Sequence, residues 1–466
     1  MNCPGTFDEP LTRRDALKLA SNGFGYLAAA SMLNADTEAP VPKLHHAAKA
    51  KRVLFLFMPG GVSHMESFDP KPKLAELDGK PAKLNSYVAG PNRKWLGPLW
   101  EFRQHGQCGA PVSALFPQIA VHVDSLAIVR SMKSEFPLHA RGNVFLHTGK
   151  NVGGFPSLGS WITYGIGSGN RNLPSYVLLR DAYVPPGGIE NFSNGFLPAS
   201  HQATHIRDEG MPVDNIRPGD EKNRVQRAKL DAVIGQDRQF LKATGGSDAI
   251  ESAIANYEMA YRMQSLVPDV LDLAREPESI RKLYGLDAED KPKRLYGLQC
   301  LRARRLLEAG VRFVEVTCPN LIGQNGTWDQ HDHLKRDHEH NAMVTDQAIG
   351  ALLTDLKQRG MFEDTLVIWA GEFGRTPDTG NGDGRDHHPF CFTIWMAGGG
   401  IKSGVTYGET DELGDQVARD PVTIHDLHAT ILHTLGLNHE RLTYRFGGRE
   451  QRLTDVHGNV VKAILA

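Results

Sequence analysis

The amino-acid sequence predicts one large α/β domain built on a mostly parallel sheet. Short, nearly continuous apolar runs alternate with longer stretches of helical periodicity. A parallel strand is apolar along its length because helices cover both faces of its sheet. Several of the runs end at glycines and lead directly into acids and histidines. Open α/β sheets bind ligands beyond the carboxyl ends of their strands, so this arrangement predicts a site at one edge of the sheet.

The composition is that of a soluble globular protein. Hydrophobic residues make up 40% and charged residues 23% of the 466 residues, which is ordinary for a folded domain. The net charge of -2 argues against a basic nucleic-acid-binding surface. No apolar run reaches the ~18 residues that a membrane-spanning helix requires. Twenty histidines, many of them beside acids, favour metal or acid–base chemistry, although scattered surface histidines account for most of them.

The first 36 residues carry the pattern of an export signal. The stretch from Thr12 to Lys18, TRRDALK, is similar to the twin-arginine motif, and a weakly apolar, alanine-rich segment follows it. The alternative is an ordinary helix that exposes two arginines. We predict a twin-arginine signal over residues 1–36 and a linker over 37–51, with the twin-arginine translocation machinery as a partner and a periplasmic or otherwise exported location.

The predicted domain starts with a buried strand over residues 52–58. Glycines follow it, and they permit a close approach of the backbone to a ligand. Ser63 and His64 come next and provide a hydroxyl and an imidazole just beyond the strand. A capped turn that serves only backbone N–H groups is the alternative.

The next part of the domain adds two strands and a helix. Strand patterns cover residues 126–130 and 176–179, and a proline and a serine in the entry turn predict a helix over 156–162.

A long insertion follows, at about residues 180–310. Residues 180–220 have the composition of a loop, and a long ordered loop is typical of a lid over a site. Residues 221–310 have helical periodicity and many charges. We expect the arginines of the last helix, around residues 301–310, to form a solvated face.

A second group of candidate ligands follows a predicted strand over residues 311–316. Asp329 and His331 lie in the loop behind it. They offer the oxygen and nitrogen donors that suit Zn²⁺ or a similar divalent ion. The same spacing also occurs in plain polar turns, which is the alternative.

A third group follows the most periodic helix, residues 334–359. Residues 366–370 predict the strand after it. The glycine-rich loop behind that strand carries four candidate site residues: Glu372, Arg375, Asp386 and His387. The alternative is a surface loop whose charges face water. A strand over 392–397 and a helix that begins at Thr423, with a capping box, complete the domain.

Several segments are similar to a known family. Five marks together resemble the exported bacterial family designated domain of unknown function 1501: GGVSHMESFDPKP (60–72), residues 147–174, GEFGRTP (371–377), GRDHHP (384–389) and LTDVHG (453–458). Residues 345–368 and 426–436 also resemble the surroundings of the metal site in sulfatases. The resemblance covers roughly residues 52–460 and implies an alkaline phosphatase-like, three-layer domain over residues 52–466. It also implies a divalent metal (Zn, Ca, Mg or Mn) and an anionic ester substrate, with sulfated polysaccharides among the candidates.

The sequence departs from the sulfatase pattern at the site itself. Sulfatases hold their cation with paired aspartates where this chain has Gly60-Gly61, and Glu372-Phe373 replaces their later Asp-His pair. The nucleophile position falls on His139, and the position of the sulfatase arginine falls on Asn143, with Arg141 nearby. The sulfatase metal site and its formylglycine chemistry therefore do not transfer to this chain.

Two functions remain. The first is a divalent-metal-dependent hydrolase of sulfate or phosphate esters, with metal ligands drawn from His64, Asp329, His331, Glu372, Asp386 and His387. Its catalytic residues would be Ser63 or His139 as nucleophile, His139 alternatively as general acid, and Arg141 and Arg375 as a clamp for the anionic group. The second is a non-catalytic relative with a degenerate metal centre, a binding or assembly protein of the cell envelope. Convergence of the candidate residues would favour the first function, and separate surfaces the second.

Overall fold

The computed structural model describes residues 43–82, 92–208, 212–213, 223–319, 328–379 and 382–466. Chain contacts separate Met1–Lys43 from Leu44–Ala466, and the second unit holds all the elements of the fold given below. The predicted export signal lies outside the described residues. Within them, no helix combines the length and the apolar character needed to span a bilayer.

The fold is organised around a nine-stranded sheet. Its described strands, in spatial order, are β13 (Val405–Tyr407), β5 (Leu126–Lys133), β12 (Phe392–Ala397), β9 (Thr365–Ala370), β1 (Arg52–Phe57), β8 (Phe313–Thr317), β6 (Tyr176–Leu179) and β7 (Thr204–Ile206), with β16 (Val422–Thr423) beside β5. The neighbours are parallel except that β12 runs antiparallel to β5 and to β9. The predicted mostly parallel sheet is confirmed.

Strand β1 shows why these strands are apolar throughout. Side chains of a strand alternate between the two faces of its sheet. Leu54 and Leu56 belong to one buried cluster, and Phe55 and Phe57 belong to another. Both faces of the sheet are therefore covered.

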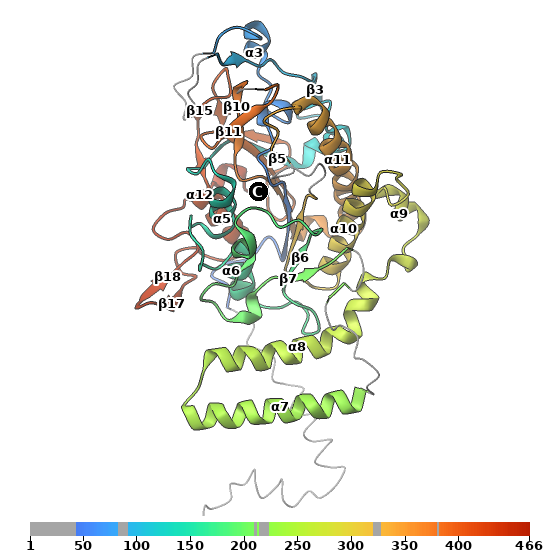
Figure 1. The fold of residues 1–466 in the computed structure, drawn as a ribbon, viewed down its shortest axis with the longest axis vertical. Helices are drawn as coiled ribbons and strands as arrows, with labels where there is room; N and C mark the ends of the chain where they lie inside the picture. Colours follow the sequence, from blue (N-terminus) through green and yellow to red (C-terminus); the bar gives the residue numbers. More distant parts are fainter. Residues whose placement is uncertain (1–42, 83–91, 209–211, 214–222, 320–327, 380–381) are drawn as a thin grey trace, which may run out of the picture. The chain divides into compact units, whose positions relative to one another are not determined.

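Helices cover the two faces and give three layers (Figure 1). One cluster is built with α4 (Pro117–Ala120), α10 (Lys291–Glu308) and α11 (Leu334–Gln358). The other is built with α5 (His139–Thr148), α6 (Leu158–Ile166) and α12 (Ile424–Thr434). The predicted α/β/α domain is thus the observed one.

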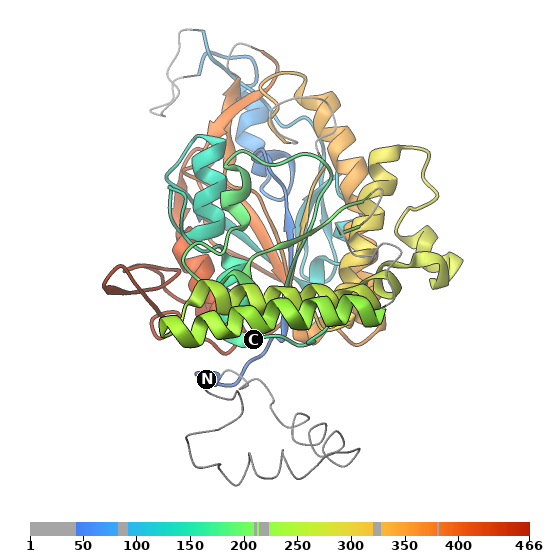
Figure 2. The same cartoon turned by 60° about the horizontal axis from the view of Figure 1, so that its bottom comes forward.

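The helical periodicity predicted over residues 221–310 corresponds to four helices of the described chain, α7 to α10. The long helices α7 (Asn223–Thr244) and α8 (Asp248–Leu271) form a hairpin, seen in front in Figure 2. The short helix α9 (Glu278–Leu283) leads from them to α10.

The arginines of α10 do not form the solvated face that the sequence predicts. Arg304 is 1% exposed and forms ion pairs with Glu276 (2.6 Å) and Asp355 (2.9 Å). Acids that are distant in sequence compensate its charge, so the helical pattern alone does not reveal its burial.

A hairpin replaces the predicted glycine-rich loop after β9. Strands β10 (Gly374–Thr379) and β11 (Arg385–His388) pair with each other, and β2 (Lys94–Trp95) extends them to a three-stranded sheet. This small sheet carries the third group of candidate site residues.

Smaller elements complete the described chain. They are α3 (Pro72–Leu77), β3 (Phe102–His105), β4 (Ala110–Ser113), β14 (Glu409–Thr410), β15 (Val417–Arg419), β17 (Tyr444–Phe446), β18 (Arg449–Gln451) and the 3-10 turns η1 (His64–Glu66), η2 (Val123–Ser125), η3 (Gly188–Phe192), η4 (Ala199–His201), η5 (Leu273–Arg275), η6 (Phe362–Asp364) and η7 (Lys462–Ile464).

The predicted capping box of α12 is present. The Thr423 hydroxyl accepts the N–H of Asp426 (3.2 Å), and the Asp426 carboxylate accepts the N–H of Thr423 (2.9 Å). We expect Thr423→Ala to lower the free energy of unfolding by about 1 kcal/mol, because it leaves a helix N–H without its acceptor. Urea unfolding measures the change. Ser200→Ala, at an exposed position, is the control, and equal losses in both variants would contradict the prediction.

Candidate metal centre

Three segments that are distant in sequence meet at the carboxyl ends of β1, β8 and β9. These strands are parallel neighbours, so the segments that follow them leave the sheet at the same edge. Asp329 and His331 come after β8, Glu372 follows β9, and His387 lies on β11. His139 joins them as the first residue of α5.

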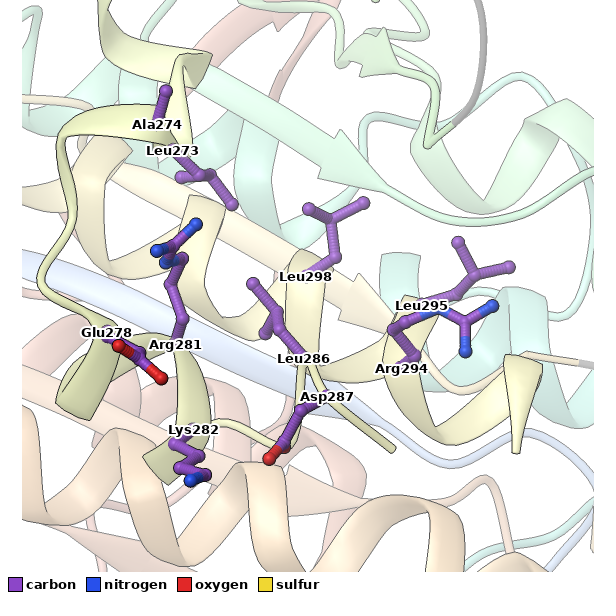
Figure 3. Close-up of a pocket in the computed structure, with 10 residues that line it drawn as sticks. All are labelled: Leu273, Ala274, Glu278, Arg281, Lys282, Leu286, Asp287, Arg294, Leu295 and Leu298. Atoms are coloured by element: carbon purple, nitrogen blue, oxygen red, sulfur yellow. The ribbon is translucent and has the colours of Figure 1, made fainter. Parts of the chain in front are cut away.

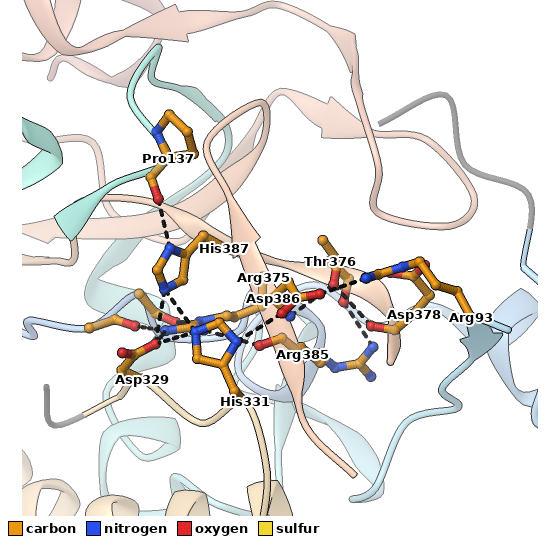
Figure 4. Close-up of polar contacts among 12 residues, drawn as sticks. Arg93, Pro137, Asp329, His331, Arg375, Thr376, Asp378, Arg385, Asp386 and His387 are labelled. Atoms are coloured by element: carbon orange, nitrogen blue, oxygen red, sulfur yellow. Dashed lines mark hydrogen bonds and ion pairs between the residues drawn. The ribbon is translucent and has the colours of Figure 1, made fainter. Parts of the chain in front are cut away.

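The carboxylate of Asp329 is the centre of the cluster (Figure 4). Its Oδ1 lies 3.0 Å from Nε2 of His331 and 3.0 Å from Nε2 of His387. Its Oδ2 lies 3.1 Å from Nε2 of His139. One ligand atom each from His139, Asp329 and His387 falls within 4.8 Å of the others, which is close enough for one metal ion.

The other ring nitrogen of each histidine also has a partner. Nδ1 of His139 lies 2.6 Å from the Glu372 carboxylate, and Nδ1 of His331 lies 2.8 Å from the Asp386 carboxylate. Nδ1 of His387 donates to the carbonyl of Pro137 (2.7 Å). These contacts place Glu372 and Asp386 behind the histidines that face Asp329.

The backbone at Gly60, just after β1, requires a glycine. Its N–H donates to both oxygens of the buried Glu372 carboxylate, at 3.0 and 3.1 Å. Its φ is +108°, and a Cβ there would lie 2.5 Å from the backbone nitrogen of Trp328. Glycine at this position therefore lets the backbone N–H reach Glu372 without a clash.

Arg375 is fully buried and holds the loops together. Its Nε donates to the Gly61 carbonyl (2.9 Å), and its Nη1 donates to the Arg385 carbonyl (3.0 Å). Its Nη2 donates to the Asp329 carboxylate (2.7 Å) and to the carbonyl of Gly60. All three nitrogens face protein acceptors, so the guanidinium positions Asp329.

Arg141 stands apart from this network. It is exposed in the first turns of α5. Of the two arginines predicted as an anion clamp, it is the one placed on the surface.

Ser63 and His64 belong to neighbouring buried networks. The Ser63 hydroxyl donates to Glu66, whose carboxylate also pairs with Arg385 (2.6 Å). The imidazole of His64 contacts the Gly414 carbonyl (3.0 Å), and burial lowers its pKa to about 3. The structure therefore brings together Asp329, His331, Glu372, Asp386, His387 and His139, and places Ser63 and His64 in other contacts.

The electrostatics of the cluster follow from these contacts. Burial opposes ionisation of Asp329, but the three histidines and Arg375 hold its pKa well below the ordinary value. The bonds from Asp329 and Asp386 raise the pKa of His331 to about 9. Burial, together with the charge of Arg375, lowers the pKa of His387 to about 4.

Arg93 is a contributor that sequence reasoning missed. It forms ion pairs with Asp378 and, at 2.6 Å, with Asp386. Arg93 lies 293 residues before Asp386, and no motif joins them. Arg93 comes near Asp378 and Asp386 only because β2 pairs with β10 in the folded chain.

A separate hollow lies in the helical insertion (Figure 3). It has a volume of about 520 Å³ and is lined by Leu273, Ala274, Glu278, Arg281, Lys282, Leu286, Asp287, Arg294, Leu295 and Leu298. None of these residues belongs to the Asp329 cluster, so the hollow and the cluster are distinct features.

Comparison with known proteins gives a family but no curated relative. The model of the family described as "Protein of unknown function (DUF1501)" matches residues 50–465. No curated protein sequence matches the chain.

Among solved structures, the chain is similar to members of the alkaline phosphatase and sulfatase superfamily. The PsFucS1 sulfatase from Pseudoalteromonas sp. is 12% identical, with 89% of this chain and 71% of that chain covered and a TM-score of 0.36. The lipoteichoic acid synthase LtaP from Listeria monocytogenes is 9% identical, with coverages of 89% and 78% and a TM-score of 0.38. A protein in the alkaline phosphatase superfamily from Vibrio parahaemolyticus is 11% identical, with coverages of 88% and 74% and a TM-score of 0.35. These likenesses are too weak to carry a conclusion about activity.

Proposed function

The chain belongs to the DUF1501 family, and from the geometry around Asp329 we propose that it is an exported, divalent-metal-dependent hydrolase of sulfate or phosphate esters. The location follows from the twin-arginine pattern in residues 1–36, and sulfated polysaccharides are among the candidate substrates.

The observation that carries this proposal is the convergence of His139, Asp329 and His387. Nε2 of His139 is buried and lies 3.1 Å from Oδ2 of Asp329, but the angles of this contact are not those of a hydrogen bond. A buried ring nitrogen without a partner is costly unless something else binds it. Imidazole nitrogens with a carboxylate oxygen are a donor set that suits Zn²⁺ and similar ions. The residues present therefore fit a divalent cation.

The charge balance around the histidines supports a divalent cation. Four carboxylates belong to the connected network: Asp329, Glu372, Asp378 and Asp386. Two guanidiniums, those of Arg93 and Arg375, pair with them. Histidines that bind a metal are neutral, and with neutral imidazoles this network carries two negative charges, which one divalent cation would neutralise.

The start of α5 supports an anionic substrate. Its N-cap residue, Leu138, makes no side-chain capping bond. The first N–H groups of a helix lack intrahelical acceptors and attract anions. Arg141 adds an exposed positive charge to the same turn. His139 and Arg141 would then lie beside the ester group.

Water is the nucleophile that this arrangement favours. The Ser63 hydroxyl is committed to Glu66, and the residue at the start of α5 is His139 rather than serine, threonine or cysteine. A divalent cation, when bound, would lower the pKa of water and neutralise charge on the ester oxygens. The histidines and Asp329 would hold the cation, and the first turn of α5 would orient the anionic group. A covalent enzyme intermediate is not part of this proposal.

A non-catalytic binding protein receives less support. That alternative predicts candidate residues on separate surfaces, whereas six of the predicted site residues lie in one hydrogen-bonded cluster with His139.

Metal removal tests the proposed function. We expect protein purified from its native compartment to contain a bound divalent metal and to hydrolyse an aryl sulfate or an aryl phosphate. Chelation should abolish turnover, and re-addition of the metal should restore it. Circular dichroism of the chelated protein controls for unfolding. Metal-free protein that turns over neither ester with added Zn²⁺, Mn²⁺, Mg²⁺ or Ca²⁺ would contradict the proposal.

A further inference from the structure

We infer that His331 is a fourth ligand of this metal centre, and that Glu372, Asp386 and the Pro137 carbonyl orient the histidine ligands from behind. The inference rests on the metal centre of the proposed function but is independent of the ester chemistry.

The first step is the position of the proton on each imidazole. A neutral imidazole has one N–H and one lone pair. Carbonyl and carboxylate oxygens only accept hydrogen bonds, so a ring nitrogen forms a hydrogen bond to one of them only when it carries the hydrogen. Nδ1 of His139, His331 and His387 each faces such an oxygen, at 2.6, 2.8 and 2.7 Å. Nε2 of each ring faces the Asp329 carboxylate, so a neutral ring that keeps its Nδ1 bond presents its lone pair from Nε2 toward Asp329.

The second step is where these lone pairs meet. Nε2 of His331, Nε2 of His387 and Oδ1 of Asp329 are 3.0 Å apart in every pairing. With neutral rings, three acceptor atoms this close repel one another unless a positive charge, either a metal cation or a proton on one ring, lies between them. Zn–N and Zn–O bonds are about 2.0–2.2 Å, so ligand atoms of one ion lie about 3 Å apart. His331 thus lies as close to Asp329 and His387 as the ligand atoms of one ion do.

The third step is the support behind the ligands. Histidines that bind metals usually donate their other N–H to a carboxylate or a backbone carbonyl, which fixes the ring. Asp386 supports His331 in this way and is itself held by Arg93 (2.6 Å). Glu372 supports His139 and is held by the N–H of Gly60. Both carboxylates are thereby occupied as orienting groups.

The chemistry of the proposed ligands limits which metal ions the site would prefer. Three imidazole nitrogens and one carboxylate favour Zn²⁺ or a similar first-row ion, whereas Mg²⁺ and Ca²⁺ prefer oxygen ligands. We therefore expect Zn²⁺ to bind far more tightly than Mg²⁺ or Ca²⁺.

Metal-binding measurements on two variants test this assignment. Zn²⁺ affinity is measured by competition with a chromophoric chelator, and the metal content is measured by elemental analysis after dialysis. His331→Ala should weaken Zn²⁺ binding more than 100-fold through loss of a ligand, and Asp386→Asn about 10–100-fold through loss of the orienting bond. The side chain of His331 is 45% exposed, so its removal should leave the fold intact, as thermal unfolding would verify.

His340→Ala is the matched control. His340 also lies near a carboxylate, Asp290 (3.2 Å), but on α11 and outside the cluster. The His340→Ala variant should bind Zn²⁺ with the same affinity as the unmodified protein. Unchanged Zn²⁺ affinity in His331→Ala would overturn the assignment, as would an unmodified protein that prefers Mg²⁺ or Ca²⁺. If the variants lose Zn²⁺ as expected but no ester is hydrolysed, the ligand assignment stands and the proposed hydrolase function fails.

Discussion

Asp329→Asn is expected to abolish metal binding and to lower ester turnover more than 100-fold, with the fold retained. Asp329 faces all three histidines, so no other carboxylate can replace its charge at that point. Changes to residues that merely orient a ligand already cost about 10–100-fold, and removal of the central charged ligand should exceed this. The asparagine amide keeps an oxygen that accepts the bond from Arg375, which preserves the loop. Metal content and turnover of an aryl ester measure the effect.

A matched variant separates this effect from a general loss of charge. Asp383→Asn removes a carboxylate that accepts the N–H of His333 and lies outside the cluster around Asp329. The Asp383→Asn protein should keep its bound metal and its ester turnover. An Asp329→Asn protein that still binds Zn²⁺ at the original affinity would show that the centre lies elsewhere.

Arg375→Ala is expected to lower the free energy of unfolding by about 3–5 kcal/mol, the range measured when one partner of a buried ion pair is removed. The guanidinium is fully buried, and its removal takes one charged donor from the Asp329 carboxylate and removes the side-chain donor of four backbone carbonyls, those of Gly60, Gly61, Trp328 and Arg385. Chemical denaturation of the metal-free protein measures the loss without a contribution from metal binding.

Arg141→Ala provides the comparison for Arg375. Arg141 is exposed, and a surface substitution of this kind changes stability by no more than about 0.5 kcal/mol. Its effect should instead be a raised KM for the anionic ester. A stable Arg375→Ala protein with only a raised KM would instead make Arg375 a substrate clamp.

The elements of the central sheet were predictable because they are buried on both sides. The runs over residues 52–58, 176–179 and 392–397 carry apolar side chains at nearly every position, and they form β1, β6 and β12. The direction of β12 was not predictable. An apolar run does not reveal the direction of its strand, because an antiparallel strand that is buried within a mostly parallel sheet has the same apolar pattern.

The hairpin β10–β11 was not predicted from the sequence because its segment contains charged residues. Arg375 and Arg385 are fully buried there, whereas arginine in a glycine-rich segment is typical of a surface loop. Their partners, Asp329 and Glu66, are 46 and 319 residues away. A local pattern holds no information about such distant compensation.

The sequence by itself determined the fold class, the family and most members of the site: Asp329, His331, Glu372, Asp386 and His387 all follow predicted strands, and the carboxyl ends of parallel strands share one edge. The tertiary structure decided what each does. It placed His139, predicted as a nucleophile or general acid, against Asp329, where we propose it as a metal ligand, and it buried Arg375 as a support for Asp329. The physical reason is that strand order and burial follow from local patterns of apolar residues, whereas the role of a polar side chain depends on which acceptor or charge the fold places within about 3 Å of it.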